Sequence, residues 1–303
     1  MPITLILILS LNIIYPMINT DLPNSNLNRY APKKIVNNSL GILTTAKSVL
    51  AVDGKSKKIL FTKNKDRILP IASITKLMSV LILLDHNIDW NQEVIIKKED
   101  RREGGRVYLG YGEKVTVRDL LNLALVASDN QAIISLVRAS NLSEDDFVKL
   151  MNVKAKKLRM EKTKFFDPTG LDPRNVSTAE DLMKLGAEIF NHNNIVKILS
   201  KREYSFKDVK TTRAHHIFST DRLLGSFLSD KKAKYFLQSG KTGHLDEAGY
   251  CFFCEAENNK GNKIFLVILG SKTNQGRFQE AKGLINWIFT NWEWDNSGNY
   301  EKK

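Results

Sequence analysis

The chain has 303 residues, of which 42% are hydrophobic and 26% are charged, and this balance excludes both a wholly disordered chain and a polytopic membrane protein. Its two cysteines are too few for a disulfide-stapled scaffold. Lysine and arginine number 46 against 33 acidic residues, and the net charge of +13 suggests an anionic partner such as nucleic acid, a membrane surface or an acidic polymer.

The N-terminal segment is apolar and precedes the expected folded unit. Residues 3–14 are almost all aliphatic, and the first charged residue is Asp21. About 12 apolar residues are too few for a membrane-spanning helix of about 20, but they suit the apolar core of an export signal. No basic residue or clear cleavage site accompanies them, so an uncleaved anchor and a buried strand or helix stay open. We expect a signal peptide or anchor over 1–20 and a linker over 21–45.

The first folded elements are a hairpin and a helix. Two apolar runs between residues 48 and 62 flank Asp53-Gly54, a favourable turn pair, and predict a β-hairpin. Apolar residues then recur with helical spacing over 73–85, and a short extended segment follows at 94–96. Residues 101–112 are charged and rich in glycine, which indicates a loop.

A helical region follows this loop. Apolar periodicity predicts helices over 117–127 and 130–139. Ser143 and Ser177 each open a capping sequence, and the helices that they start are expected to end near residues 158 and 190.

The C-terminal part returns to strands. The chain is strand-like from Tyr204, and an apolar strand begins at Tyr235. Segments 249–257 and 263–269 predict a second hairpin, and the last helix covers about 277–292. Because early and late strands enclose the helices, we expect one antiparallel sheet interrupted by a helical insertion, with a cleft between them.

The first of three short motifs is Ser73-Ile74-Thr75-Lys76. At i and i+3 of a helix, Ser73 and Lys76 share a face, and the helix N-terminus favours developing negative charge on Ser73. A lysine in an apolar helix face tends to have a lowered pKa, so Lys76 can accept the serine proton. The alternative is a capping serine beside an ordinary surface lysine.

The second motif, Ser128-Asp129-Asn130, lies between two predicted helices. The Ser128 hydroxyl can relay a proton, and the Asn130 amide can hold a substrate carbonyl. Serine, aspartate and asparagine are also ordinary turn and cap residues, so a simple helix–helix turn is the alternative.

The third motif, Lys241-Thr242-Gly243, follows an apolar strand. Lys241 and Thr242 can bind a carboxylate, and Gly243 lets another backbone approach closely. The backbone N–H of His244 can form an oxyanion hole together with that of Ser73. A strand-end turn is the alternative.

In this order, and about 55 and about 110 residues apart, the three motifs resemble those of the low-molecular-mass penicillin-binding proteins, the D-alanyl-D-alanine carboxypeptidase/endopeptidase family of serine peptidases. The resemblance covers roughly residues 45–292. Further matching stretches are 70–78, 120–125 with 128–132, 169–172, 177–182 and Ala248-Gly249.

The resemblance implies an α+β fold of the β-lactamase/transpeptidase type, with an antiparallel sheet flanked by helices and an all-helical subdomain. The catalytic domain would cover 46–294, its helical subdomain about 85–190, and a tail 295–303. It also implies that Ser73 attacks the carbonyl of a D-alanyl peptide bond and becomes acylated, that Lys76 is its base, and that Ser128 passes the proton to the leaving amine.

The substrate contacts follow from the same resemblance. Asn130 would position the substrate, and Lys241 with Thr242 would bind its terminal or adjacent carboxylate. The expected partners are peptidoglycan stem peptides, with β-lactam antibiotics as covalent inhibitors that acylate Ser73. An exported enzyme of the periplasm or cell envelope is expected.

The resemblance leaves the type of activity open. A class A β-lactamase needs a glutamate in a Glu-x-x-Leu-Asn stretch, and Glu144, Glu161, Glu180 and Glu188 all lack it, so a β-lactamase is the second choice. Many carboxypeptidases of the family carry an extra C-terminal β-domain, for which no room is expected here. That feature and the long loop from Arg101 favour an endopeptidase. A non-catalytic protein that binds anionic polymers is a third hypothesis, against which the intact motifs speak.

Other reactive residues are expected to have structural roles. Cys251 and Cys254 lie three apart in a predicted strand and so face opposite sides, which argues against a disulfide or a shared metal and for packing. The five histidines show no metal-ligand spacing, and His215-His216 are expected at the surface. We expect no metal, no cofactor and, without a nucleic-acid motif, no nucleic acid.

Overall fold

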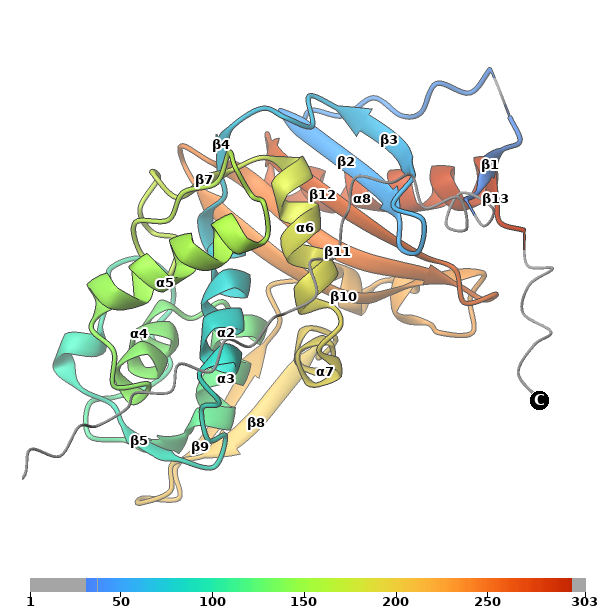
Figure 1. Ribbon diagram of the computed structural model, residues 1–303. Helices are drawn as coiled ribbons and strands as arrows, with labels where there is room; N and C mark the ends of the chain where they lie inside the picture. The colour runs from blue at the N-terminus through green and yellow to red at the C-terminus, as the bar shows by residue number, and fades with distance from the viewer. Residues whose placement is uncertain (1–30, 37, 296–303) are drawn as a thin grey trace, which may run out of the picture.

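The computed structural model describes residues 31–36 and 38–295. The predicted signal or anchor over 1–20, the first part of the expected linker and nearly all of the tail lie outside the described residues. Part of the expected linker is structured, because strand β1 (Lys33–Lys34) pairs with β13 (Trp292–Glu293). The two ends of the described chain therefore lie side by side (Figure 1).

A five-stranded antiparallel sheet forms the centre of the molecule, in the order β10-β11-β12-β2-β3. The early hairpin contributes β2 (Ser48–Asp53) and β3 (Ile59–Lys63). The late strands are β10 (Tyr235–Leu245), β11 (Gly249–Asn258) and β12 (Lys263–Ser271), and β12 pairs with β2. The sequence prediction that early and late strands share one sheet is confirmed.

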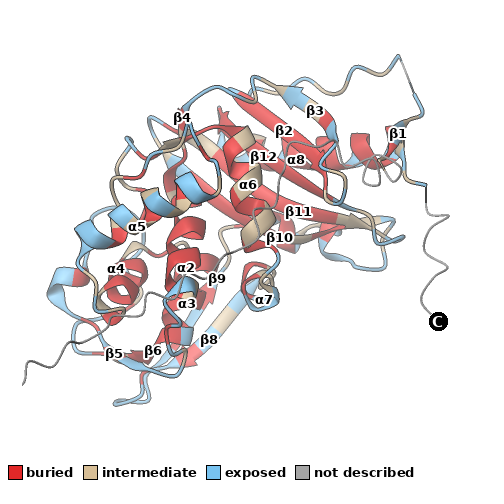
Figure 2. Cartoon of the chain, in the orientation of Figure 1, coloured by how far each residue is buried: buried red, intermediate tan, exposed pale blue. Residues whose placement is uncertain are grey.

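Side chains alternate between the two faces of this sheet, as the strand period of two requires. Val49 and Ala51 belong to the core that includes helix α8 (Asn274–Asn291), whereas Leu50 belongs to the core shared with the other helices. The same alternation places Cys254 in the core with α8 and Cys251 in the core with the other helices. Both cysteines are buried and free, as predicted. Figure 2 shows the buried layers on both faces.

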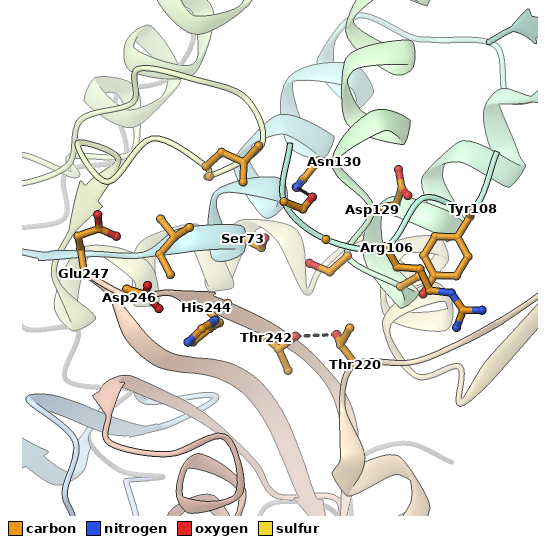
Figure 3. Close-up of a pocket in the computed structure, with 18 of the residues that line it drawn as sticks. Ser73, Arg106, Tyr108, Asp129, Asn130, Thr220, Thr242, His244, Asp246 and Glu247 are labelled. Atoms are coloured by element: carbon orange, nitrogen blue, oxygen red, sulfur yellow. Dashed lines mark hydrogen bonds between the residues drawn. The ribbon is translucent and has the colours of Figure 1, made fainter. Parts of the chain in front are cut away.

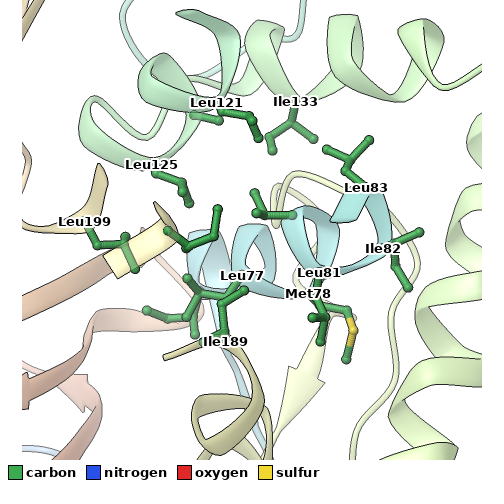
Figure 4. Close-up of a cluster of buried hydrophobic side chains, with 14 of the residues drawn as sticks. Leu77, Met78, Leu81, Ile82, Leu83, Leu121, Leu125, Ile133, Ile189 and Leu199 are labelled. Atoms are coloured by element: carbon green, nitrogen blue, oxygen red, sulfur yellow. The ribbon is translucent and has the colours of Figure 1, made fainter. Parts of the chain in front are cut away.

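The helices opposite α8 surround helix α2 (Thr75–Asp85), whose residues are buried from Thr75 to Leu83. Figure 4 shows side chains of α2 packed against neighbours from four helices. The neighbours are α3 (Val117–Val126), α4 (Asn130–Ala139), α6 (Ala179–Ile189) and α7 (Asn193–Leu199). Helix α5 (Glu144–Lys157) packs on α2 as well. Because α2 is apolar on nearly every side, it can serve as the central helix of this layer.

Two helix starts differ from the sequence prediction. The expected helix over 73–85 begins with a single 3-10 turn, η1 (Ala72–Ile74), before α2 starts at Thr75. Ser177 does not cap α6, because it belongs to β7 (Val176–Ser177), which pairs with β4 (Leu69–Pro70). Thr178 is the cap instead, and its side chain accepts a hydrogen bond from Asp181 N. At α5 the predicted cap is correct, since Ser143 accepts from Asp146 N.

Short hairpins complete the fold: β5 (Glu93–Ile95) with β6 (Lys114–Thr116), and β8 (Glu203–Lys207) with β9 (Ala214–Phe218). Three more 3-10 turns are η2 (Lys98–Asp100), η3 (Arg222–Gly225) and η4 (Phe227–Ser229). The expectation that both histidines of β9 lie at the surface is wrong for His215. It is buried, with its ring stacked on Phe206, while His216 on the opposite strand face is exposed.

Among the described residues, no helix is both long enough and apolar enough to cross a membrane.

Candidate active site

A cleft of about 560 Å³ lies between strand β10 and the helical layer, and all three motifs contribute to its wall (Figure 3). Ser73 comes from η1, Ser128 and Asn130 come from the junction of α3 and α4, and Thr242 comes from β10. Residues that are far apart in the sequence thus meet in one cavity, at the place where the sequence predicts a cleft.

Ser73 is held by close backbone packing around η1. Gly170 has a φ of +88°, and a Cβ built on it would lie 2.1 Å from Ala72 O. A Cβ on Gly243 would lie 2.8 Å from Ile71 O and 3.2 Å from Ser73 N. Only glycine permits these approaches. The two glycines therefore let β10 and the loop at residue 170 press against the turn that carries Ser73.

Lys76 lies within hydrogen-bonding distance of Ser73. Its Nζ donates to Ser73 Oγ at 2.9 Å, to Asn130 Oδ1 at 2.7 Å and to the Thr169 carbonyl at 2.7 Å. The side chain is fully buried. Burial lowers the pKa of Lys76 to about 7, against the opposing effect of Asp129 and Asp167. A large fraction of Lys76 is therefore neutral near pH 7 and can accept a proton from Ser73.

The second motif is positioned by the junction of α3 and α4. Ser128 adopts a left-handed backbone with a φ of +60°. Asp129 caps α4, because its side chain accepts from Ala132 N, and burial raises the pKa of Asp129 to about 6. Asn130 uses its oxygen for Lys76, and its Nδ2 donates to the Gly104 carbonyl at 3.0 Å. Ser128 and Asn130 thus lie on either side of a capping residue, and both line the cleft.

The third motif supplies a second buried lysine. Lys241 Nζ donates to Ser128 Oγ at 2.7 Å and to the Thr242 carbonyl at 2.9 Å. Burial holds the pKa of Lys241 well below its usual range, and the positive charge of Lys76 is the second cause of this lowering. Each of the two motif serines in the cleft is therefore paired with a lysine that is largely shielded from water.

Strand β10 is an edge strand of the five-stranded sheet, so alternate backbone groups point away from β11 rather than toward another strand of that sheet. Gly243 and His244 of this strand line the cleft. The His244 ring stacks on Tyr250 with 4.1 Å between centroids. An extended substrate can therefore lie along β10 in the manner of an added strand.

Three further residues at the cleft have no role that the sequence alone predicts. The Thr169 carbonyl binds Lys76, and the Thr220 hydroxyl lies 2.6 Å from that of Thr242. Arg277 of α8 donates to the Gly243 carbonyl at 2.8 Å, and burial lowers its pKa to about 10. Thr169 belongs to a stretch that matches the family, but that match assigns it no contact. Thr220 and Arg277 carry no local signal, because their contacts depend on distant segments.

Among the described residues, no group of three or more His, Cys, Asp or Glu side chains is placed to hold a metal ion.

Comparison with known proteins gives consistent matches. The family model described as D-alanyl-D-alanine carboxypeptidase matches residues 36–273. The D-alanyl-D-alanine endopeptidase of Pseudomonas aeruginosa is 32% identical over 251 residues, covering 80% of this chain and 77% of that protein. The D-alanyl-D-alanine carboxypeptidase DacF of Bacillus subtilis is 29% identical, covering 82% of this chain and 63% of that protein.

Solved structures show the same fold. Penicillin-binding protein D2 of Listeria monocytogenes, in its ampicillin-bound form, has a TM-score of 0.70 and 30% identity, with 83% of this chain and 100% of that chain covered. A mutant of the Streptomyces K15 DD-transpeptidase has a TM-score of 0.74 and 25% identity, with 82% and 99% covered. The α+β fold that the sequence resemblance implied is therefore confirmed.

Proposed function

The chain belongs to the D-alanyl-D-alanine carboxypeptidase family of serine peptidases, and from this premise we propose that it hydrolyses D-alanyl cross-links of peptidoglycan through an acyl-enzyme on Ser73. The observation that carries the proposal is the hydrogen bond of 2.9 Å between Lys76 and Ser73, made by a lysine whose pKa is about 7. A nucleophile and a base in this relation are what acyl transfer at neutral pH requires.

Acylation begins when Ser73 Oγ attacks the carbonyl carbon of the D-alanyl residue while neutral Lys76 takes the hydroxyl proton. The N–H groups of Ser73 and His244 are proposed to stabilise the oxyanion. The C–N bond then breaks, and the proton that Lys76 accepted passes through Ser128 to the leaving amine, so that Lys76 is neutral again. The bond of 2.7 Å from Lys241 to Ser128 supports this relay, because it orients the hydroxyl. A water molecule completes hydrolysis by attacking the ester carbonyl, and Ser73 regains its proton.

Substrate binding is assigned to the polar groups that surround this centre. The carboxylate beyond the scissile bond would be bound by Lys241 and Thr242, whose hydroxyl is oriented by Thr220. Arg277, which also lines the cleft, adds positive potential. Asn130 would turn its amide from the Gly104 carbonyl to a carbonyl of the substrate.

The endopeptidase assignment rests on two supports. Relatives named D-alanyl-D-alanine endopeptidase reach 32% identity in Pseudomonas aeruginosa and 34% in Haemophilus influenzae. The loop after Arg101 brings Arg106 and Tyr108 into the cleft wall, on the opposite side of Ser73 from Asp246 (Figure 3). This part of the wall offers contacts to a leaving group larger than one D-alanine. A carboxypeptidase, as DacF is named, is the alternative.

Digestion of purified cross-linked muropeptide dimers separates these two activities. We expect the wild type to convert dimers to monomers, as measured by chromatography and mass spectrometry, and Ser73→Ala to convert none. Release of free D-alanine from pentapeptide stems with the cross-links left intact would instead establish a carboxypeptidase.

β-Lactams are proposed to acylate Ser73, since one solved relative, penicillin-binding protein D2 of Listeria monocytogenes, has structures in cefotaxime-bound and ampicillin-bound forms. Export to the periplasm or cell envelope, with residues 1–20 as signal or anchor, is proposed from the substrate. Cell fractionation with N-terminal sequencing tests it, and a cytoplasmic protein that retains Met1 would contradict it.

A further inference from the structure

The cleft around Ser73 has an acidic end. Asp246 and Glu247, in the turn between β10 and β11, line the cleft, and Figure 3 shows them on the opposite side of Ser73 from Arg106. Both residues are exposed. Within the described parts of the chain, neither carboxylate takes part in an ion pair or a side-chain hydrogen bond. Two unpaired negative charges therefore face the space that a substrate occupies.

The direction of the bound substrate decides which part of it meets this acidic end. On the proposed function, the carboxylate beyond the scissile bond lies at Thr242, and the scissile carbonyl lies at the N–H groups of Ser73 and His244. The acyl portion must then continue away from Thr242, past His244. The next residues of the cleft wall in that direction are Leu245 and Asp246.

The side chains at this end combine apolar and acidic groups. Leu171 and Leu245, both half-buried, line the cleft together with Asp246 and Glu247. An apolar wall that ends in carboxylates suits an aliphatic side chain with a terminal ammonium, because the stem packs on the leucines while the charge stays near water. A neutral or acidic side chain would gain nothing from the two carboxylates.

We propose that Asp246 and Glu247 select acyl donors in which the residue before the D-alanyl residue carries a long aliphatic side chain with a free terminal ammonium. This inference rests on the proposed function and specifies its substrate. A donor whose ammonium is already acylated, as when the same stem carries a second cross-link, loses the ion pair. The enzyme then prefers stems with a free side-chain amine over stems linked at that amine.

Two thioester donors test this preference without depending on the size of the leaving group. Nα-acetyl-L-lysyl-D-alanyl-thioglycolate carries the ammonium, and its Nε-acetylated analogue lacks it, while both keep a carboxylate on the leaving group. Release of thioglycolate gives kcat/KM for each donor. We expect the free-amine donor to be favoured by roughly 1.5- to fivefold at low ionic strength, the range of exposed ion pairs. Added salt should reduce this ratio.

The variant carrying Asp246→Asn and Glu247→Gln should bring the ratio close to one. Because each enzyme is judged by the ratio of two donors, a general loss of activity cancels. Glu161→Gln, which removes an exposed carboxylate outside the cleft, should keep the wild-type ratio. Equal use of both donors by the wild type, or an unchanged ratio in the double variant, would overturn the inference. Failure of the wild type to release thiol from either donor would instead contradict the proposed function, and the inference with it.

Discussion

Lys76 Nζ lies 2.9 Å from Ser73 Oγ, in a site so well buried that the pKa of Lys76 falls to about 7. A surface lysine would keep its proton at this pH and could not act as a base. Helix α2 therefore does more than fill the core. Because it packs on all sides, α2 holds Thr75 and Lys76 where water is largely excluded, directly after the turn that carries Ser73.

Acylation of Ser73 should accelerate as pH rises through about 7, because only deprotonated Lys76 can accept the serine proton. Below that pH the rate should fall about tenfold per unit, and above it the rate should level off. Rate constants for labelling by a fluorescent penicillin across this range measure the profile. Asp129→Asn should move the inflection to lower pH, because the charge of Asp129 raises the pKa of Lys76. An unchanged inflection would argue against Lys76 as the titrating group.

Ser128→Ala should slow peptide hydrolysis by about 10²-fold or more, the scale of a lost proton-transfer group. The variant removes the acceptor of the Lys241 hydrogen bond and the proposed relay to the leaving amine. Steady-state kinetics on a muropeptide dimer measure the effect. Ser140→Ala, which removes a hydroxyl bonded to the Val137 carbonyl outside the cleft, is the control. Near-normal turnover by Ser128→Ala would remove Ser128 from the mechanism.

Gly170→Ala should lower both stability and acylation. Alanine at this position combines a backbone φ of +88° with a Cβ placed 2.1 Å from Ala72 O, so the turn that carries Ser73 must move. We expect a loss of about 2–4 kcal/mol in the free energy of unfolding, from strain and overpacking together. Urea unfolding and penicillin labelling measure the two effects.

Gly112→Ala is the matched control for this variant, because Gly112 has a similar φ of +82° but a Cβ added to it would meet no atom within 4 Å. It should cost only about 1–2 kcal/mol and leave labelling intact. Equal losses in the two variants would show that the contact with Ala72 does not matter.

Thr220→Val should raise KM for substrates that carry a carboxylate by about three- to tenfold, because the Thr242 hydroxyl loses its partner at 2.6 Å. The change in kcat should be smaller. Thr211→Val removes a hydroxyl bonded to Asp208 in the turn of the β8–β9 hairpin and serves as the control. If Thr220→Val changes kcat alone, Thr220 does not act through carboxylate binding.

The parts of this molecule that sequence could predict are those set by local pattern. Examples are the apolar strand β2 with its Asp-Gly turn and the helix at 130–139. The three motifs can likewise be recognised from their residues and from the number of residues between them. Helix α7 has only seven residues and begins with asparagines, so it lacks a periodic signal long enough to recognise. The position of Ser177 depends on its pairing with Leu69, more than 100 residues away.

The same distinction applies to the cleft. Ser73 and Lys76 are one helical turn apart, so their contact can be inferred from spacing. The contact between Arg277 and Gly243 depends on how α8 packs against the sheet, and that between Thr220 and Thr242 depends on where β9 ends. Neither contact exists until the chain has folded, and no local residue pattern predicts either of them.

Intact-protein mass spectrometry after incubation with penicillin tests the central claim most directly. The account predicts one covalent adduct per chain, located by peptide mapping on Ser73, formed rapidly by the wild type and by a Lys65→Ala control, much more slowly by Lys76→Ala and not at all by Ser73→Ala. An adduct that persists in Ser73→Ala, or none on the folded wild type, would contradict the assignment of Ser73 as the nucleophile.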